Sequence, residues 1–131
     1  MVSIGVTLIL QNTCALELIA NATVNNMNIK FFIIKDQNFE STFFGEEKNG
    51  QKTVIAALEL ADKGTIVLKN IDALSFENQG KLSQFLKERR AFSLGSQIPY
   101  KSNARIISSS KKDLNQLVSE GKLLEELYYL I

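Results

Sequence analysis

The residues best placed to do chemistry are Lys69 and Asn70, which directly follow an apolar run. That run, residues 65–68, reads Thr-Ile-Val-Leu and is preceded by Gly64. A short unbroken run of apolar and β-branched residues is typical of a strand buried on both faces of a parallel sheet. In α/β proteins, functional groups lie just beyond the carboxyl ends of such strands. Here that place carries an ammonium group and an amide.

Several other catalytic groups are absent from the sequence. The 131 residues include no histidine and one cysteine. This composition excludes Ser-His and Cys-His catalysis and zinc sites built on imidazole. A single cysteine cannot form an internal disulfide, which fits a reducing cytoplasm. We therefore expect a cytoplasmic protein with no metal site.

Composition and charge indicate an ordinary globular domain. The hydrophobic fraction is 45%, the charged fraction 22% and the formal net charge +1, so we expect one domain over residues 1–131. A dedicated nucleic-acid surface usually shows a basic excess. We thus interpret Lys87, Arg89 and Arg90 as a solvated helix end and expect no direct DNA contact. No apolar run approaches the roughly 20 residues that span a bilayer, and the N-terminus lacks the basic region of a signal peptide.

Apolar and β-branched runs predict strands at residues 6–10, 30–34, 65–69 and 105–109. Helical spacing of apolar residues predicts helices near 15–22, 53–62, 76–90 and 114–120, with a last one near the C-terminus. Strands that alternate with helices imply βαβ crossovers and a parallel sheet.

Individual residues refine this outline. Ile55, Leu58 and Ala61 are expected to form the buried stripe of the helix near 53–62. Lys63-Gly64 should end that helix as a glycine cap does, and Ser75 should cap the next one. In the mixed stretch before residue 50, the expected core anchors are Phe39, Phe43 and Phe44.

Several motifs of the second half follow one another in a recognisable order. They are Phe44-Gly45-Glu46-Glu47-Lys48, Leu60-Ala61-Asp62-Lys63-Gly64-Thr65-Ile66-Val67-Leu68, Gln79-Gly80-Lys81-Leu82, Arg105-Ile106-Ile107 with Lys112-Asp113-Leu114, and Glu126-Leu127-Tyr128-Tyr129. In this order and approximate spacing they resemble the central AAA+ ATPase domain of sigma-54-dependent transcription activators. The resemblance is most specific from Glu40 onward. It implies an α/β three-layer sandwich with a parallel sheet, like a P-loop NTPase (AAA+) core that lacks the helical lid.

The resemblance also gives a place for the family's phosphate-binding loop, which is Gly-rich and ends in Gly-Lys-Glu. Backbone N–H groups of such a loop cradle the phosphates, and the lysine meets their charge. Alignment on Glu17 puts Leu10, Thr13 and Ala15 at glycine positions and Leu16 at the lysine position. We therefore expect no working phosphate loop.

The remaining nucleotide-handling positions are substituted as well. The acidic pair that holds Mg²⁺ in the family corresponds to Lys69 and Asn70, and the sensor asparagine to Lys111. The arginines that reach a neighbouring subunit's nucleotide correspond to Leu124 and Leu130. An ammonium group in place of a carboxylate should repel a divalent cation. The resemblance thus predicts a non-catalytic pseudo-ATPase that needs no cofactor.

The family's sigma-contacting loop, Gly-Ala-Phe-Thr-Gly-Ala, should follow Lys48. The chain instead runs Asn49-Gly50-Gln51-Lys52 and is several residues shorter. Family strand order would also leave residues 6–10 at a sheet edge. An open edge invites pairing, so we expect a dimer through it or a cover from the C-terminal segment.

Two functions are compatible with these substitutions. The first is a transcription-regulating interaction module that binds a protein partner, either a related AAA+ activator or a second copy. The second is a metal-independent nucleotide or anion sensor using Lys69 and Lys111, which would follow neighbouring strands in the family. A decayed remnant or a fragment of a larger regulator also fits the sequence.

Overall fold

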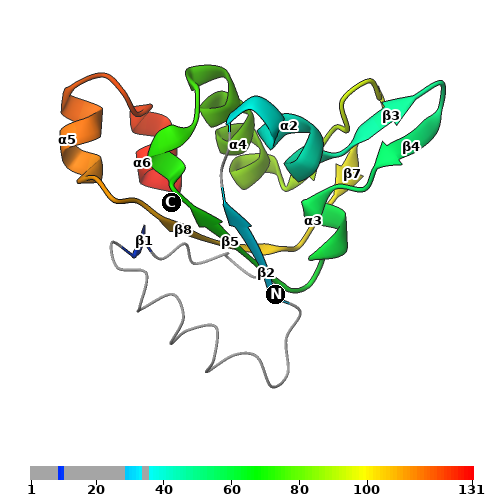
Figure 1. Ribbon diagram of the computed structural model, residues 1–131, viewed down its shortest axis with the longest axis horizontal. Helices are drawn as coiled ribbons and strands as arrows, with labels where there is room; N and C mark the ends of the chain where they lie inside the picture. The colour runs from blue at the N-terminus through cyan, green and yellow to red at the C-terminus, as the bar shows by residue number, and fades with distance from the viewer. Residues whose placement is uncertain (1–8, 11–28, 34–35) are drawn as a thin grey trace.

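The structure, a computed structural model, describes residues 9–10, 29–33 and 36–131. Its centre is a parallel sheet with the strand order β1-β8-β5-β2. These strands are β1 (Ile9–Leu10), β8 (Arg105–Ser109), β5 (Thr65–Lys69) and β2 (Ile29–Ile33). Figure 1 shows the described helices α2, α4, α5 and α6 gathered on one side of this sheet.

Strand β5 pairs on both sides, with β2 and with β8. Ile66 lies opposite Lys30 on one side and Ile106 on the other. The first four residues of β5 are buried, which explains why its sequence is a continuous apolar run and not an alternating one.

The strand predictions are confirmed where the structure describes them. The predicted strands 65–69 and 105–109 match β5 and β8 residue for residue, and β2 starts one residue earlier than predicted. Of the predicted strand 6–10, only Ile9 and Leu10 lie within the described residues, and they form β1. The helix predicted near 15–22 lies outside the described residues.

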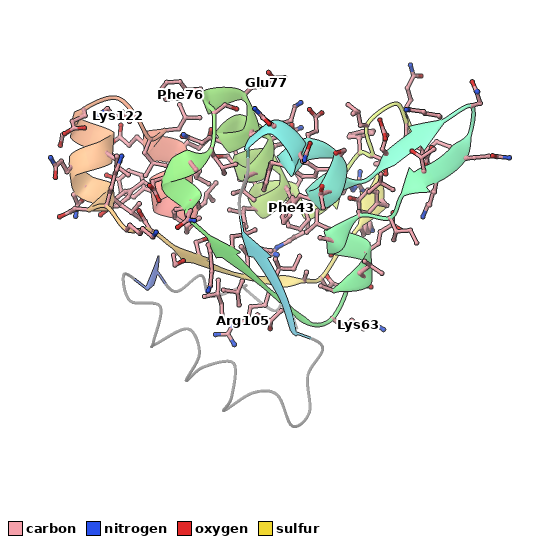
Figure 2. All side chains as sticks on the ribbon, in the orientation of Figure 1. Phe43, Lys63, Phe76, Glu77, Arg105 and Lys122 are labelled. Carbon is pink, nitrogen blue, oxygen red and sulfur yellow. The ribbon has the colours of Figure 1, made fainter. Side chains whose placement is uncertain are left out.

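The core lies between the sheet and helices α2 (Asp36–Phe44), α4 (Phe76–Glu88) and α6 (Glu125–Leu130). Phe39 and Phe43 are fully buried, and their rings stack with centroids 4.8 Å apart. Phe43 also meets Phe85 of α4 edge to face, at 6.4 Å, and it points from α2 toward the sheet in Figure 2. The expected aromatic anchors are therefore confirmed, because Phe44 is buried in the same cluster.

The helix predicted over residues 53–62 is wrong in its first half. Thr53 and Val54 belong to β4 (Gln51–Val54), which forms a hairpin with β3 (Glu46–Lys48), and α3 (Ala57–Leu60) is the helical part that remains. Asn49 and Gly50 both have positive φ, at 53° and 76°, as a two-residue type I′ turn requires. Because this turn pairs the two strands, Thr53 and Val54 are extended, and the helix begins only at Ala57.

The buried stripe predicted for that helix changes accordingly. Leu58 and Ala61 are buried, but Ile55 precedes the short helix and is 54% exposed. Lys63, and not Gly64, adopts the left-handed conformation after α3.

The other connections follow simple capping and turn rules. Ser75 accepts a hydrogen bond from the backbone N–H of Asn78, as predicted for the start of α4. Asp113 caps α5 (Leu114–Ser119) in the same way, with its carboxylate 2.8 Å from the N–H of Asn115. The remaining elements are η1 (Ile71–Ala73) and the antiparallel pair β6 (Arg90–Ala91) and β7 (Tyr100–Lys101).

One polar side chain of the sheet is buried without a partner. Within the part of the chain that the structure describes, the Ser108 hydroxyl is fully buried and makes no hydrogen bond. It lies in the middle of β8, on the same face as Ile106, which belongs to the helix-covered core. An unsatisfied buried hydroxyl lowers the free energy of unfolding.

We expect Ser108→Ala to raise the free energy of unfolding by about 1 kcal/mol, because it removes that hydroxyl without opening a large cavity. Urea denaturation would measure the change. Ser102→Ala is the matched control: Ser102 is equally buried, but its hydroxyl donates to the Leu58 carbonyl at 2.7 Å and accepts from the Ala104 N–H. The control should lose roughly 1–3 kcal/mol, and equal losses in both variants would contradict this interpretation.

Candidate functional site at the carboxyl ends of β5 and β8

The predicted cationic residues lie at the end of one strand and just past the end of its neighbour. Lys69 is the half-buried last residue of β5, and Lys111 is exposed two residues beyond β8. The register pairs Leu68 with Ser108, so both strands run toward the same edge of the sheet. Among the described residues, neither ammonium group has an ion pair or a side-chain hydrogen bond.

The cavity at this edge does not join the two lysines. Lys111 lines a space of about 420 Å³ together with Lys112, Gln116 and Lys122. Lys69 is not part of its lining. The fold therefore brings Lys69 and Lys111 to the same carboxyl end of the sheet, but only Lys111 lines this cavity.

Asn70 has a conformational role that its sequence position did not reveal. Its φ and ψ angles are 64° and 48°, in the left-handed region, and it is the residue before the 3-10 turn η1. Its carbonyl accepts a hydrogen bond from the N–H of Ala73 at 2.9 Å. Asparagine tolerates this conformation better than most side chains do, so the residue fits the turn that ends β5.

A carboxylate and a hydroxyl that the sequence reasoning missed connect the two strand ends. The Ser110 hydroxyl lies 3.2 Å from Asp72 Oδ1 and 2.9 Å from the Lys112 carbonyl, to which it can donate. The same oxygen accepts a hydrogen bond from the Lys112 N–H. Both residues are polar and follow a predicted strand closely, and this was the signal available in the sequence. Across the described ranges, no group of three or more His, Cys, Asp or Glu is arranged to hold a metal ion.

The two leucines that the resemblance aligns with the family's arginines lie near the C-terminus, and Leu124 packs against the core. Leu124 is half-buried against the core, and its backbone N–H donates to Gln79 Oε1 at 2.8 Å. Leu130 is partly buried at the end of α6. Leu10 is the last residue of β1, whereas Thr13, Ala15 and Leu16 lie outside the described residues.

The basic residues at the end of α4 are used differently from one another. Lys87 forms an ion pair with Glu126 of α6. Arg89 donates from Nη1 to the Ala104 carbonyl at 2.9 Å, and its partial burial lowers the pKa of the guanidinium. Arg90 is exposed and begins β6. Lys87 and Arg89 thus make contacts within the fold, and the interpretation as a solvated helix end fits Arg90 alone of the three.

Comparison with known proteins identifies the family. The sigma-54 interaction domain profile matches residues 9–131. The chain belongs to the sigma-54 interaction domain family. It is 37% identical over 100 residues to the response regulator protein FleR of Pseudomonas aeruginosa, which covers 73% of this chain and 21% of FleR. It is 34% identical over 96 residues to the transcriptional regulatory protein TyrR of Haemophilus influenzae, covering 73% of this chain and 30% of TyrR.

Solved structures agree with the fold of this sigma-54 interaction domain. A crystal structure of NtrX from Brucella abortus superposes with a TM-score of 0.80 at 26% identity, over 94% of this chain and 30% of NtrX. A complex of the same protein with ADP gives 0.75 at 26% identity, over 86% of this chain and 26% of NtrX. The α/β fold with a parallel AAA+-like core is therefore confirmed. The chain spans about a fifth to a third of the length of these relatives.

The stretch after Lys48 takes the form of a tight turn. The β3–β4 hairpin projects from the end of the molecule opposite α5 in Figure 1, and Lys48 pairs directly with Gln51 across Asn49-Gly50. No helix in the described residues is long and apolar enough to cross a membrane.

The conformation of Asn70 yields a stability prediction. Asn70→Gly should change the free energy of unfolding little, whereas Asn70→Val should lower it by about 1–2 kcal/mol, because a β-branched side chain is strained at positive φ. Thermal unfolding followed by circular dichroism would measure both. Asn103, which is exposed and not at positive φ, is the control for the same two substitutions. Equal stability of the two Asn70 variants would refute the conformational role.

Proposed function

We propose that this sigma-54 interaction domain is a non-catalytic pseudo-ATPase that contributes to transcription regulation through protein–protein contacts. The observation that carries the proposal is the end of β5. Lys69 and Asn70 stand where the family resemblance expects the acidic pair, and Asn70 serves the turn into η1 through its left-handed backbone. Phosphoryl transfer depends almost entirely on positioning and charge stabilisation, so this replacement removes the group that would hold Mg²⁺.

The relatives support the regulatory part of the proposal. FleR is described as a response regulator and TyrR as a transcriptional regulatory protein. NtrX has been crystallised with ADP, so a nucleotide occupies that protein. In our proposal this chain keeps the scaffold for contacts with proteins and lacks the turnover chemistry.

The partner that we favour is a related AAA+ activator or a second copy of this chain. Among the described strands, β1 lies at one edge of the sheet and pairs only with β8. An unpaired strand edge is a template for pairing with another chain. A partner that adds a strand beside β1 would extend the sheet, with Ile9 and Leu10 at the contact.

A second candidate function is a metal-independent anion sensor. The observation in its favour is that Lys69 and Lys111 lie at one sheet edge with no ion pair among the described residues. An unpaired ammonium group is available to a phosphate. The separate lining of the cavity at Lys111 counts against this candidate.

Phosphate release from Mg²⁺-ATP tests the pseudo-ATPase. The purified chain should release no phosphate above the buffer rate, and Lys69→Ala should leave that result unchanged, because the wild-type side chain already opposes Mg²⁺. An active sigma-54 activator serves as the positive control. Lys101→Ala is the matched control variant, because Lys101 is an exposed lysine outside the site. Magnesium-dependent hydrolysis that Lys69→Ala alters and Lys101→Ala does not would overturn the proposal.

Calorimetry with ATP in the absence of Mg²⁺ separates the two candidate functions. We expect no binding heat at millimolar ATP. Binding that Lys69→Ala and Lys111→Ala each weaken would replace the interaction module by the anion sensor.

Mixing the chain with an active relative and following both by analytical ultracentrifugation would test the protein contact directly, and sedimentation of both proteins as separate monomers would contradict it.

A further inference from the structure

The described residues form a second pocket, and none of the predicted site residues lines it. It lies between α2, α4 and the segment that follows β6, and its volume is about 260 Å³. Phe44 and Phe85 contribute buried aromatic surface to it, while Phe92 and Leu94 remain 50% and 40% exposed at its margin. Exposed apolar side chains gathered around a hollow are typical of a surface that binds a partner.

Backbone hydrogen bonds hold the outer wall of this pocket in place. The Leu94 N–H donates to the Gly45 carbonyl and the Glu47 N–H to the Leu94 carbonyl, each at 2.8 Å. Gly95 has a φ of 84°, and a Cβ there would lie 2.4 Å from the Glu47 carbonyl oxygen. Only glycine allows the segment to approach β3 so closely. The pocket is therefore formed before a partner arrives, which lowers the entropic cost of binding.

The charges around the pocket leave one cation available. Lys81 pairs with Glu40 at 2.6 Å and with Glu77 at 3.2 Å, so Glu40 and Lys81 neutralise each other within the lining. Arg90 also lines the pocket, is exposed, and has no ion pair or side-chain hydrogen bond among the residues that the structure describes. A free guanidinium beside an aromatic surface favours a planar carboxylate next to an apolar group.

We infer that this pocket binds a protein segment in which a large apolar side chain stands next to an aspartate or glutamate. The apolar side chain packs against Phe44, Phe85 and Phe92, and the carboxylate pairs with Arg90. The volume supports a segment of this size, because it lies below the roughly 300–1,000 Å³ of pockets that enclose whole small ligands. The inference deepens the proposed function, and it rests on that function only for the statement that the contact regulates transcription.

Titration with defined peptides, followed by NMR chemical shifts of the full chain, tests the inference. The probe is acetyl-Gly-Leu-Glu-Gly-amide. The comparison peptides replace its glutamate by lysine or its leucine by glycine. The acidic apolar peptide should bind about tenfold more tightly than either comparison peptide, with the shifts concentrated at the pocket lining. Equal binding of all three peptides, or shifts concentrated elsewhere on the chain, would overturn the inference.

Two charge-reversal variants sharpen the test. Arg90→Glu should weaken binding of the glutamate peptide by about tenfold and should favour the lysine peptide instead. Lys101→Glu is the matched control, because Lys101 lies directly opposite Arg90 in the β6–β7 pair, is exposed, and does not line the pocket. It should change the affinity less than twofold. Equal losses in both variants would reduce the effect to overall charge and sink the inference.

The outcomes distinguish this inference from the proposed function. If the chain binds the peptide and also hydrolyses ATP, the pseudo-ATPase proposal fails and the pocket inference stands. If the chain does not bind the peptide, does not hydrolyse ATP and still binds a related activator, the pocket inference fails and the proposed function stands.

Discussion

The pairing of β5 with strands on both of its sides is the constraint on which the rest of the described structure depends. Because β2 and β8 flank it, every backbone polar group along its length can be satisfied within the sheet, and its side chains are free to be apolar. Ile66 and Leu68 join the core beneath the helices, while Val67 is buried although it points to the opposite face. Helices α2, α4 and α6 pack on one face of the sheet, and β5 is one of the two inner strands of that sheet.

This arrangement also determines what the end of β5 can do. A parallel sheet brings the carboxyl ends of its strands together, which is where open α/β sheets bind their ligands. In this chain the same edge holds two lysines without ion partners among the described residues, a left-handed asparagine and a hydroxyl shared between Asp72 and Lys112. The asparagine completes a turn and the hydroxyl completes hydrogen bonds. Under the proposed function, the lysines place positive charge where a divalent cation would have to bind.

The opposite end of the molecule offers a different kind of surface. The segment after β6 forms one wall of an aromatic pocket, and backbone hydrogen bonds of Leu94 join it to Gly45 and to Glu47 of β3. Tyr100 adds to this rigidity: its hydroxyl donates to the Phe44 carbonyl at 2.7 Å, and burial raises the pKa of the phenol, so the donor stays protonated. Under the proposed function, the domain needs a preformed contact surface more than it needs catalytic groups, and this pocket would supply one.

The sequence alone determined the parts of the fold that depend on local composition. The strands β5 and β8, the Ser75 cap and the buried phenylalanines were all predicted, because each follows from a pattern of neighbouring residues in the sequence. The motifs of the second half also identified the family. Tertiary structure decided the rest. The hairpin around Asn49-Gly50 took Thr53 and Val54 out of the predicted helix. Leu124 packs against the core, and Glu40, Lys81 and Arg90 meet around one pocket from separate elements. The physical reason is that burial and charge pairing at these residues depend on neighbours far away in the chain, which no local spacing encodes.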